Sequence, residues 1–171
     1  NPALGGGGIL DVGCYCASMA RLIAGAALAK DFADPVEVTG AGHLGESRVD
    51  DYAIASLKFP GDIVAQLATG VHLSQENVVR VFGSEGWILV PSPWIPSREP
   101  KPTTIVVHRS GKETEELVVE SDNWLYTREA DVVARDIGRR EAAPPAMGWD
   151  DTLGNMRTLD AWRAAIGLVY E

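Results

Sequence analysis

The chain has 171 residues, of which 46% are hydrophobic and 23% are charged, and its formal net charge at pH 7 is −9. A chain of this size and composition folds as a globular protein with a real core, which excludes the disordered and fibrous classes. The acidic balance argues against nucleic acid and anionic membranes as partners, and the lack of a long unbroken apolar run argues against a membrane-spanning helix.

A glycine-rich segment, Gly5–Gly8, leads directly into a predicted helix over residues 9–24. Glycine has no Cβ, so this backbone can lie close to a ligand or to another domain. Asp11 and Tyr15 are four residues apart, which puts a carboxylate and a phenol on one face of the helix. A second face carries only small residues, so we expect this helix to be packed on two sides.

The two cysteines, Cys14 and Cys16, lie two residues apart in this helix, where their side chains point in different directions. They are therefore not expected to form a disulfide with each other, and no second Cys/His cluster suggests a zinc site. Reduced, structural cysteines favour a cytoplasmic protein. Because the chain begins with Asn1 rather than Met, we expect any targeting signal to lie upstream.

After this helix the hydrophobic period becomes an alternation of apolar and polar residues, which predicts strands. Pairs of these strands flank short turns, and consecutive hairpins predict an antiparallel sheet. The proline-rich stretch 91–102 is predicted to be a loop. The predicted strands cover residues 36–43, 51–59, 63–72, 78–82, 87–90, 104–108 and 115–119.

Two further helices are predicted after the strands. Thr127 is expected to cap the first, which ends at Ile137 and turns an apolar side that includes Val133 toward the core. The second begins near residue 150. Helices on both sides of such a run of strands predict an α+β fold, with a large, mostly antiparallel open sheet and helices packed on one face. With no repeat and no linker in view, residues 1–171 are predicted to form a single domain.

Residues Gly40–Gly45 read GAGHLG and match the spacing of a dinucleotide-binding fingerprint. That fingerprint needs a helix that begins at its last glycine, because the helix N-terminus holds the pyrophosphate. Residues 46–59 have the alternating period of a strand instead. We therefore interpret the glycines as part of a strand end and expect no cofactor-binding residue in this chain.

Tyr15 is the strongest candidate for chemistry, because a phenol can exchange a proton with a substrate hydroxyl. An unperturbed phenol, with a pKa near 10, is too weakly acidic to work efficiently at neutral pH, so it needs a nearby cation. No lysine occurs in its helix, and Lys30 is more than three turns away. Asp11 can orient Tyr15 or a substrate hydroxyl. Spacing alone favours a structural interpretation, in which Asp11 complements the helix dipole and Tyr15 is a half-buried aromatic residue.

Weaker candidates are His72, which faces a substrate cleft if its strand ends there, and Trp94, which lies in the proline-rich loop and can line a pocket or a dimer contact. The alternative for His72 is an ordinary surface or sheet histidine. We predict both as substrate-binding residues. His43 and His108 are interpreted as ordinary sheet residues. The pair Asp50-Asp51 is interpreted as a solvated turn rather than a metal site, because no further ligand is near in sequence. No metal site is expected.

The stretch from Gly6 to Tyr15, with Arg21 downstream, resembles the C-terminal domain of the glucose-fructose oxidoreductase/inositol dehydrogenase family, the Gfo/Idh/MocA type. Residues 59–62 and 83–86 resemble two hairpin turns of that domain, and residues 159–170 resemble its terminal helix. The resemblance thus extends over essentially the whole chain.

The resemblance implies a two-domain enzyme, in which a Rossmann domain binds NAD or NADP and the C-terminal domain supplies part of the substrate site. Hydride passes between the nicotinamide and a hydroxyl-bearing carbon of a sugar, a cyclitol or a dihydrodiol. By the motif, Asp11 is the acid of the substrate site. Tyr15 stands where many members have histidine, which resembles the xylose dehydrogenase and dihydrodiol dehydrogenase branch, where this tyrosine is the presumed acid/base.

The chain departs from the family in lacking the nucleotide-binding domain and its lysine, usually followed by proline. The resemblance therefore implies that NAD or NADP is bound mainly by the absent N-terminal domain and that this chain alone is inactive. It also implies a homo-oligomer, formed through the open sheet, and a small polyol or sugar as substrate. Two alternatives stay open: a non-catalytic domain that binds a ligand or a partner protein, and a nicotinamide-binding protein that uses Gly40–Gly45.

Overall fold

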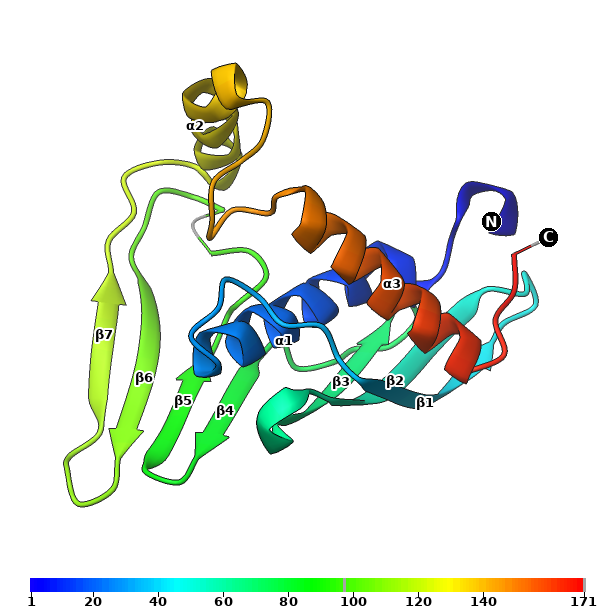
Figure 1. Cartoon of the computed structure of the whole chain (residues 1–171), viewed down its shortest axis with the longest axis horizontal. Helices are drawn as coiled ribbons and strands as arrows, with labels where there is room; N and C mark the ends of the chain where they lie inside the picture. Colours follow the sequence, from blue (N-terminus) through cyan, green and yellow to red (C-terminus); the bar gives the residue numbers. More distant parts are fainter. Residues whose placement is uncertain (97, 171) are drawn as a thin grey trace. The chain divides into compact units, whose positions relative to one another are not determined.

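The computed structural model describes residues 1–96 and 98–170 (Figure 1). The chain forms two compact units. The first contains residues 1–75 and the chain from residue 143 onward, and the second contains residues 76–142. The prediction of a single domain over residues 1–171 stays a prediction.

The first unit combines a three-stranded antiparallel sheet, in the order β1-β2-β3, with helices on one of its faces. Its strands are β1 (Glu37–Leu44), β2 (Asp50–Lys58) and β3 (Val64–Gly70). Its helical elements are the 3-10 turns η1 (Pro2–Leu4) and η3 (Pro60–Asp62), the π-helical turn η2 (Ile9–Gly13), and the helices α1 (Cys14–Ala27) and α3 (Trp149–Ala165). The strand alternation decides which side is covered. Ala53, Ala55 and Leu57 of β2 are buried under the helices, whereas Tyr52 and Ile54 are exposed on the other face.

The second unit contains a four-stranded antiparallel sheet in the order β4-β5-β6-β7. Its elements are β4 (Val79–Gly83), β5 (Gly86–Val90), β6 (Thr103–Arg109), β7 (Glu115–Val119), α2 (Leu125–Asp136) and the 3-10 turn η4 (Ile137–Arg139). The α+β class and the antiparallel pairing are thus confirmed. The hydrogen-bonded strands divide into two sheets, one in each unit, where the sequence predicted one large sheet.

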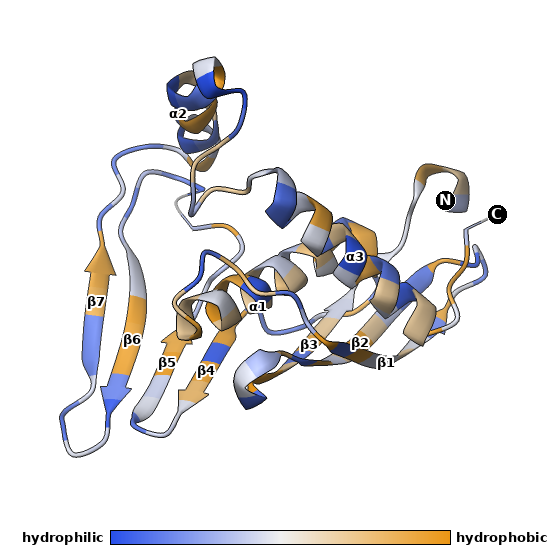
Figure 2. Ribbon diagram, viewed as in Figure 1, coloured by the Kyte–Doolittle hydropathy of each residue, from blue (hydrophilic) through white to orange (hydrophobic). Residues whose placement is uncertain are grey.

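The prediction for α2 is wrong in two respects. The helix begins at Leu125, after Trp124 with its extended backbone, so Thr127 lies inside the helix and does not cap it. Its apolar residues Val133 and Ile137 are exposed, Ile137 at 70%. Polar and apolar residues do alternate around α2 (Figure 2). Such a pattern predicts an amphipathic helix, but it does not say whether another element covers its apolar side.

The glycines of the GAGHLG stretch lie in β1, which confirms that they belong to a strand. A Cβ on Gly40 would approach the Ile54 carbonyl oxygen to 2.6 Å and the Trp162 indole to 3.3 Å. Trp162 of α3 is completely buried there and donates its indole N–H to that same carbonyl at 3.1 Å. The glycine spacing therefore lets a large aromatic residue of a helix lie flat against the sheet.

By length and composition alone, residues Pro2–Ala27 could cross a membrane, with a mean hydropathy of 1.3 in the relevant window. The sequence had predicted no such helix. In the structure, the small residues Ala17, Ala20 and Ala24 of this stretch are buried in the core of the first unit. A completely buried and ion-paired Arg21 lies between them. This is how a core helix of a globular unit packs.

Candidate functional site

The glycine-rich segment Gly5–Gly8 lies against a carboxylate of the same chain. The Ile9 N–H donates to Oδ2 of Asp50 at 2.7 Å, and Asp50 is completely buried. A Cβ on Gly7, whose φ is +120°, would overlap Oδ1 of Asp50, and a Cβ on Gly8 would come within 3.2 Å of Oδ2. The glycines thus make room for Asp50. The prediction of a solvated turn at Asp50-Asp51 is wrong for Asp50, because its carboxyl group accepts the first free N–H of a helix 41 residues away in sequence.

Two more side chains hold the same backbone. The Thr69 hydroxyl of β3 donates to the Gly8 carbonyl at 3.1 Å, and the Tyr170 hydroxyl donates to the Gly6 carbonyl at 2.6 Å. The Arg163 guanidinium lies over the Tyr170 ring at 4.8 Å. We call Asp50, Thr69 and Tyr170 the glycine clamp.

Burial raises the pKa of the Asp50 carboxyl group, although the N–H groups around it, that of Ile9 first, oppose the rise. The pKa of Tyr170 is raised as well, first by burial and then by the negative charge of Asp50. The clamp therefore favours a carboxyl group that keeps its proton to a higher pH than an exposed aspartic acid does.

This shift predicts a pH-dependent stability. The unfolded chain releases the Asp50 proton near pH 3.9, whereas the folded chain holds it longer, so this contribution to stability is lost as pH rises through the folded pKa. Asp50→Asn keeps an acceptor oxygen and cannot ionise. Its free energy of unfolding, relative to the unaltered chain, is therefore expected to increase with pH. Urea unfolding between about pH 4 and 8 measures that difference, and a difference independent of pH would contradict the expectation.

Asp11 and Tyr15 follow the clamped segment on an exposed side of the helix. Asp11 lies in the π-helical turn η2 and Tyr15 in the first turn of α1, with 57% of Tyr15 exposed. The sequence predicted an ordinary helix from residue 9. A π-helical turn is uncommon and concentrates at functional sites. The phenol is open to a ligand, and the turn beneath it is held by buried polar contacts.

His72 lies just beyond β3, at the end of the first unit where the glycine segment meets the sheet. Its Nδ1 is 3.1 Å from Oδ1 of Asp51, the residue next to Asp50. The Val71 N–H donates to the Asp51 carbonyl at 2.9 Å, and the Gly70 Cα would touch a Cβ placed on Gly8. The structure thus brings His72 to the same end of the sheet as the turn that carries Asp11.

Trp94, the other predicted substrate-binding residue, is half-buried in the loop of the second unit. The structure does not test its role or that of His72, and both stay predictions.

Arg21 holds two helical parts of the first unit together, and residue spacing in the sequence did not predict this role. Its guanidinium is completely buried; it pairs with Asp34 at 2.7 Å and with Asp151, and it also donates to the Asp151 carbonyl at 3.0 Å. It therefore ties α1 to the start of α3. Gly154 has no side chain because a Cβ there would overlap this guanidinium. Arginine suits such a position, because its planar fork reaches two acceptors at once.

Cys14 and Cys16 are free. Burial raises the pKa of Cys14 and raises that of Cys16 to about 11. A thiol with so high a pKa is a poor nucleophile and a poor metal ligand. Within residues 1–96 and 98–170, no group of three or more His, Cys, Asp or Glu side chains is placed to hold a metal ion.

Neither glycine-rich stretch fits a dinucleotide. Gly40–Gly45 runs along β1 and the following loop and opens no helix. Gly5–Gly8 does open a helix, but the Asp50 carboxyl group already accepts the first free N–H of that helix, the group that would bind a pyrophosphate. These two stretches therefore lack the open helix start that a dinucleotide fingerprint requires.

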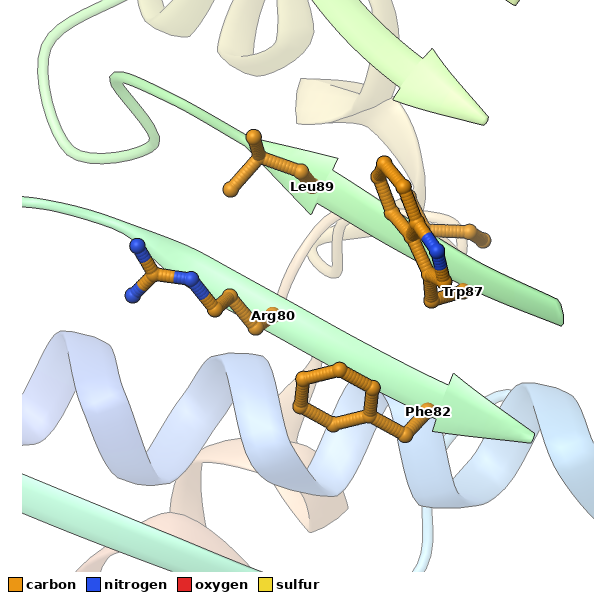
Figure 3. Close-up of a pocket in the computed structure, with 5 residues that line it drawn as sticks. Arg80, Phe82, Trp87 and Leu89 are labelled. Carbon is orange, nitrogen blue, oxygen red and sulfur yellow. The ribbon is translucent and has the colours of Figure 1, made fainter. Parts of the chain in front are cut away.

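The second unit has a shallow cavity of about 240 Å³ on one face of its sheet. Figure 3 shows Arg80, Phe82, Trp87 and Leu89 on β4 and β5 around it. The Trp87 ring stacks on His108 at 5.3 Å. No candidate residue was predicted here, because apolar alternation in a strand indicates ordinary sheet packing.

The fold and the site define an α+β protein in which a glycine-rich helix start, fastened to an antiparallel sheet, presents a carboxylate and a phenol. Residues 1–89 match the family described as the GFO/IDH/MocA C-terminal domain, and the chain belongs to this family. The expected family resemblance is thereby confirmed.

Named relatives are oxidoreductases. The chain is 32% identical over 112 residues to trans-1,2-dihydrobenzene-1,2-diol dehydrogenase of Xenopus laevis, which covers 65% of this chain and 30% of that protein. The mouse (Mus musculus) dehydrogenase of the same name is 29% identical over 108 residues, which covers 63% of this chain and 29% of that protein. The chain thus spans about a third of the length of the curated relatives that it matches.

Solved structures confirm the fold. KijD10, a 3-ketoreductase from Actinomadura kijaniata in complex with TDP-benzene and NADP, superposes with a TM-score of 0.73 at 20% identity, covering 94% of this chain and 48% of that one. UDP-N-acetylglucosamine 3-dehydrogenase GnnA from Acidithiobacillus ferrooxidans gives 0.61 at 19% identity, covering 92% of this chain and 48% of that one.

Proposed function

We propose that this chain is the substrate-binding half of an NAD(P)-dependent oxidoreductase that acts on a hydroxyl group of a sugar, a cyclitol or a dihydrodiol. One observation carries the proposal. The exposed Tyr15 phenol and the Asp11 carboxylate lie on a helix whose start is fixed by buried polar contacts. A reacting group needs such fixed placement, because small errors in position slow a reaction strongly.

Tyr15 holds or accepts the proton of the substrate oxygen during the reaction. Asp11, an exposed carboxylate in the turn before it, orients that hydroxyl or the phenol. His72, paired with Asp51 at 3.1 Å, contacts the rest of the substrate. Trp94 of the second unit stays a predicted substrate-binding residue. A nicotinamide, held mainly by the N-terminal domain of the complete enzyme, would supply the hydride chemistry.

The relatives support this chemistry. Those compared are dehydrogenases and a ketoreductase, and KijD10 was solved with NADP. KijD10 has also been solved with one lysine replaced and, separately, with one tyrosine replaced by phenylalanine. Proton transfer by Tyr15 requires a cation near the phenol, since a cation lowers the pKa of a phenol.

The open face of the three-stranded sheet is proposed as the surface through which the complete enzyme forms a homo-oligomer. Tyr52, Ile54 and Val64 are exposed there, Val64 at 76%. Ser56, Lys58 and Gln66 are exposed on the same face between Val64 and the pair Tyr52 and Ile54, so the proposed interface is partly polar. Exposed apolar side chains on an open sheet face favour a protein interface. Light scattering at micromolar concentration is expected to show an oligomer, and a monomer would contradict the assignment. A cytoplasmic location and inactivity of the isolated chain remain part of the proposal.

Sequencing the coding region upstream of Asn1 tests the proposal. A glycine-rich strand–helix unit followed by Lys-Pro is expected, because that unit supplies both the nucleotide site and the cation for Tyr15. A start codon directly before Asn1 would contradict the proposal and would favour a non-catalytic domain that binds a ligand or a partner.

A further inference from the structure

The backbone just before the candidate catalytic residues is held at three successive points by three separate parts of the fold. Tyr170, near the chain end, donates to the Gly6 carbonyl; Thr69 of β3 donates to the Gly8 carbonyl; and Asp50 of β2 accepts from the Ile9 N–H. These bonds fasten one short segment to two strands and the C-terminal tail. Asp11 follows the last of these points by two residues.

Asp50 is the most costly member of this arrangement to bury. Its side chain is completely buried, and Oδ1 forms no hydrogen bond with the described residues. A buried polar atom without a partner is destabilising, so it calls for an explanation. A helix start can be capped by an adjacent Ser, Thr or Asn at far lower cost. In this chain the cap comes from another strand, and Gly7 and Gly8 leave room for it.

The geometry points to a consequence for the reaction. A π-helical turn has few ways to satisfy its first N–H groups, so its direction depends on what binds them. Ile9 begins that turn, Asp11 lies within it and Tyr15 lies in the next turn. A cap supplied by a neighbouring residue would move with the helix. A cap supplied by β2 fixes the helix start relative to the sheet.

We propose that Asp50 is a positioning residue, whose buried carboxyl group sets the direction in which the helix start presents Asp11 and Tyr15 to the substrate. The proposal rests on the proposed function. It assigns Asp50 no contact with substrate, so the loss of Asp50 is expected to reduce kcat more than it changes KM.

The test compares three variants of the complete enzyme, this chain with its upstream nucleotide-binding part. Asp50→Ala is expected to lower kcat about 10- to 100-fold, the size of effect that a small misplacement of a reacting group produces. Asp50→Asn, which keeps the acceptor for the Ile9 N–H, is expected to restore kcat to within about threefold. Leu57→Ala is the matched control, because Leu57 is a buried core residue of the same strand. It is expected to lose stability and keep its kcat.

Hydrogen exchange of residues 9–15 in this chain gives a readout that does not depend on activity. In Asp50→Ala, these amides are expected to exchange faster, at a pH and temperature where circular dichroism shows a folded chain. In Leu57→Ala, their exchange rates are not expected to change selectively. If Tyr15→Phe leaves turnover unchanged, the proposed function fails, and the exchange data still decide whether Asp50 fixes the helix start.

The proposal is overturned if folded Asp50→Ala keeps its kcat, or if Asp50→Asn is as slow as Asp50→Ala. Should Asp50→Ala not fold, Thr69→Val replaces it, because this substitution conserves shape and removes the donor to the Gly8 carbonyl. A smaller loss of kcat with little change in KM is then expected, and an unchanged kcat would overturn the proposal.

Discussion

Replacing Tyr15 by phenylalanine in the complete enzyme is expected to lower kcat by about 10²- to 10⁴-fold, the usual contribution of a general acid or base. The ring and its packing are conserved in this substitution, and only the hydroxyl that exchanges the proton is lost. Because Tyr15 is 57% exposed, its hydroxyl is not needed to satisfy the core, so stability should change little. Nucleotide affinity should change modestly. Steady-state kinetics with saturating nucleotide measure the effect.

The matched control is Tyr126→Phe, the same substitution on an exposed tyrosine of α2 that the mechanism does not use, 75% exposed. This variant is expected to keep its kcat. Unchanged turnover in Tyr15→Phe would remove Tyr15 from the mechanism.

Replacing Arg21 by alanine is expected to destabilise the first unit by about 3 kcal/mol, toward the lower end of the range for breaking a buried ion pair. The guanidinium is completely buried, so its removal leaves Asp34 and Asp151 without their shared cation and opens a void beside Gly154. The lower end applies because both carboxylates keep partial contact with solvent. Urea unfolding followed by circular dichroism measures the loss.

Arg157 offers a control on the same carboxylate. Its guanidinium lies 4.0 Å from Asp34 and is 70% exposed, so this ion pair is screened by water. Arg157→Ala is therefore expected to change the free energy of unfolding by less than about 0.5 kcal/mol. An equal loss in the free energy of unfolding in the Arg21 and Arg157 variants would show that burial of the guanidinium does not set its contribution to stability.

Local patterns predicted most of the secondary structure. Alternation of apolar and polar residues, with the turns between the strands, located the seven strands of the described residues to within a few residues. In β2 this alternation matches alternating burial, whereas β7 is exposed along its whole length. The stripe of small residues in the first helix was a sound guide as well: Ala17, Ala20 and Ala24 are buried in the core. The absence of a helical pattern after Gly40–Gly45 correctly indicated that these glycines belong to a strand and its end.

Long-range contacts account for what the sequence did not predict. Nothing in the residues around Gly5–Gly8 shows that a carboxylate 41 positions away caps their helix, so Asp50 was interpreted as solvated. The helical pattern before Ile137 was correct, but Ile137 is exposed. Burial requires another element packed against the helix, and the pattern of one segment does not predict that contact. The resemblance identified Arg21 as part of a motif, and only the structure shows what it binds.

The most direct test of the proposed activity is turnover of the complete enzyme with NAD and with NADP on a sugar, a cyclitol and a dihydrodiol. Nucleotide reduction that depends on one of these hydroxyl compounds, and that is lost in Tyr15→Phe, is the result expected from the exposed phenol on its fixed helix start. No turnover with any of the three classes, or turnover that Tyr15→Phe retains, would contradict the proposed function.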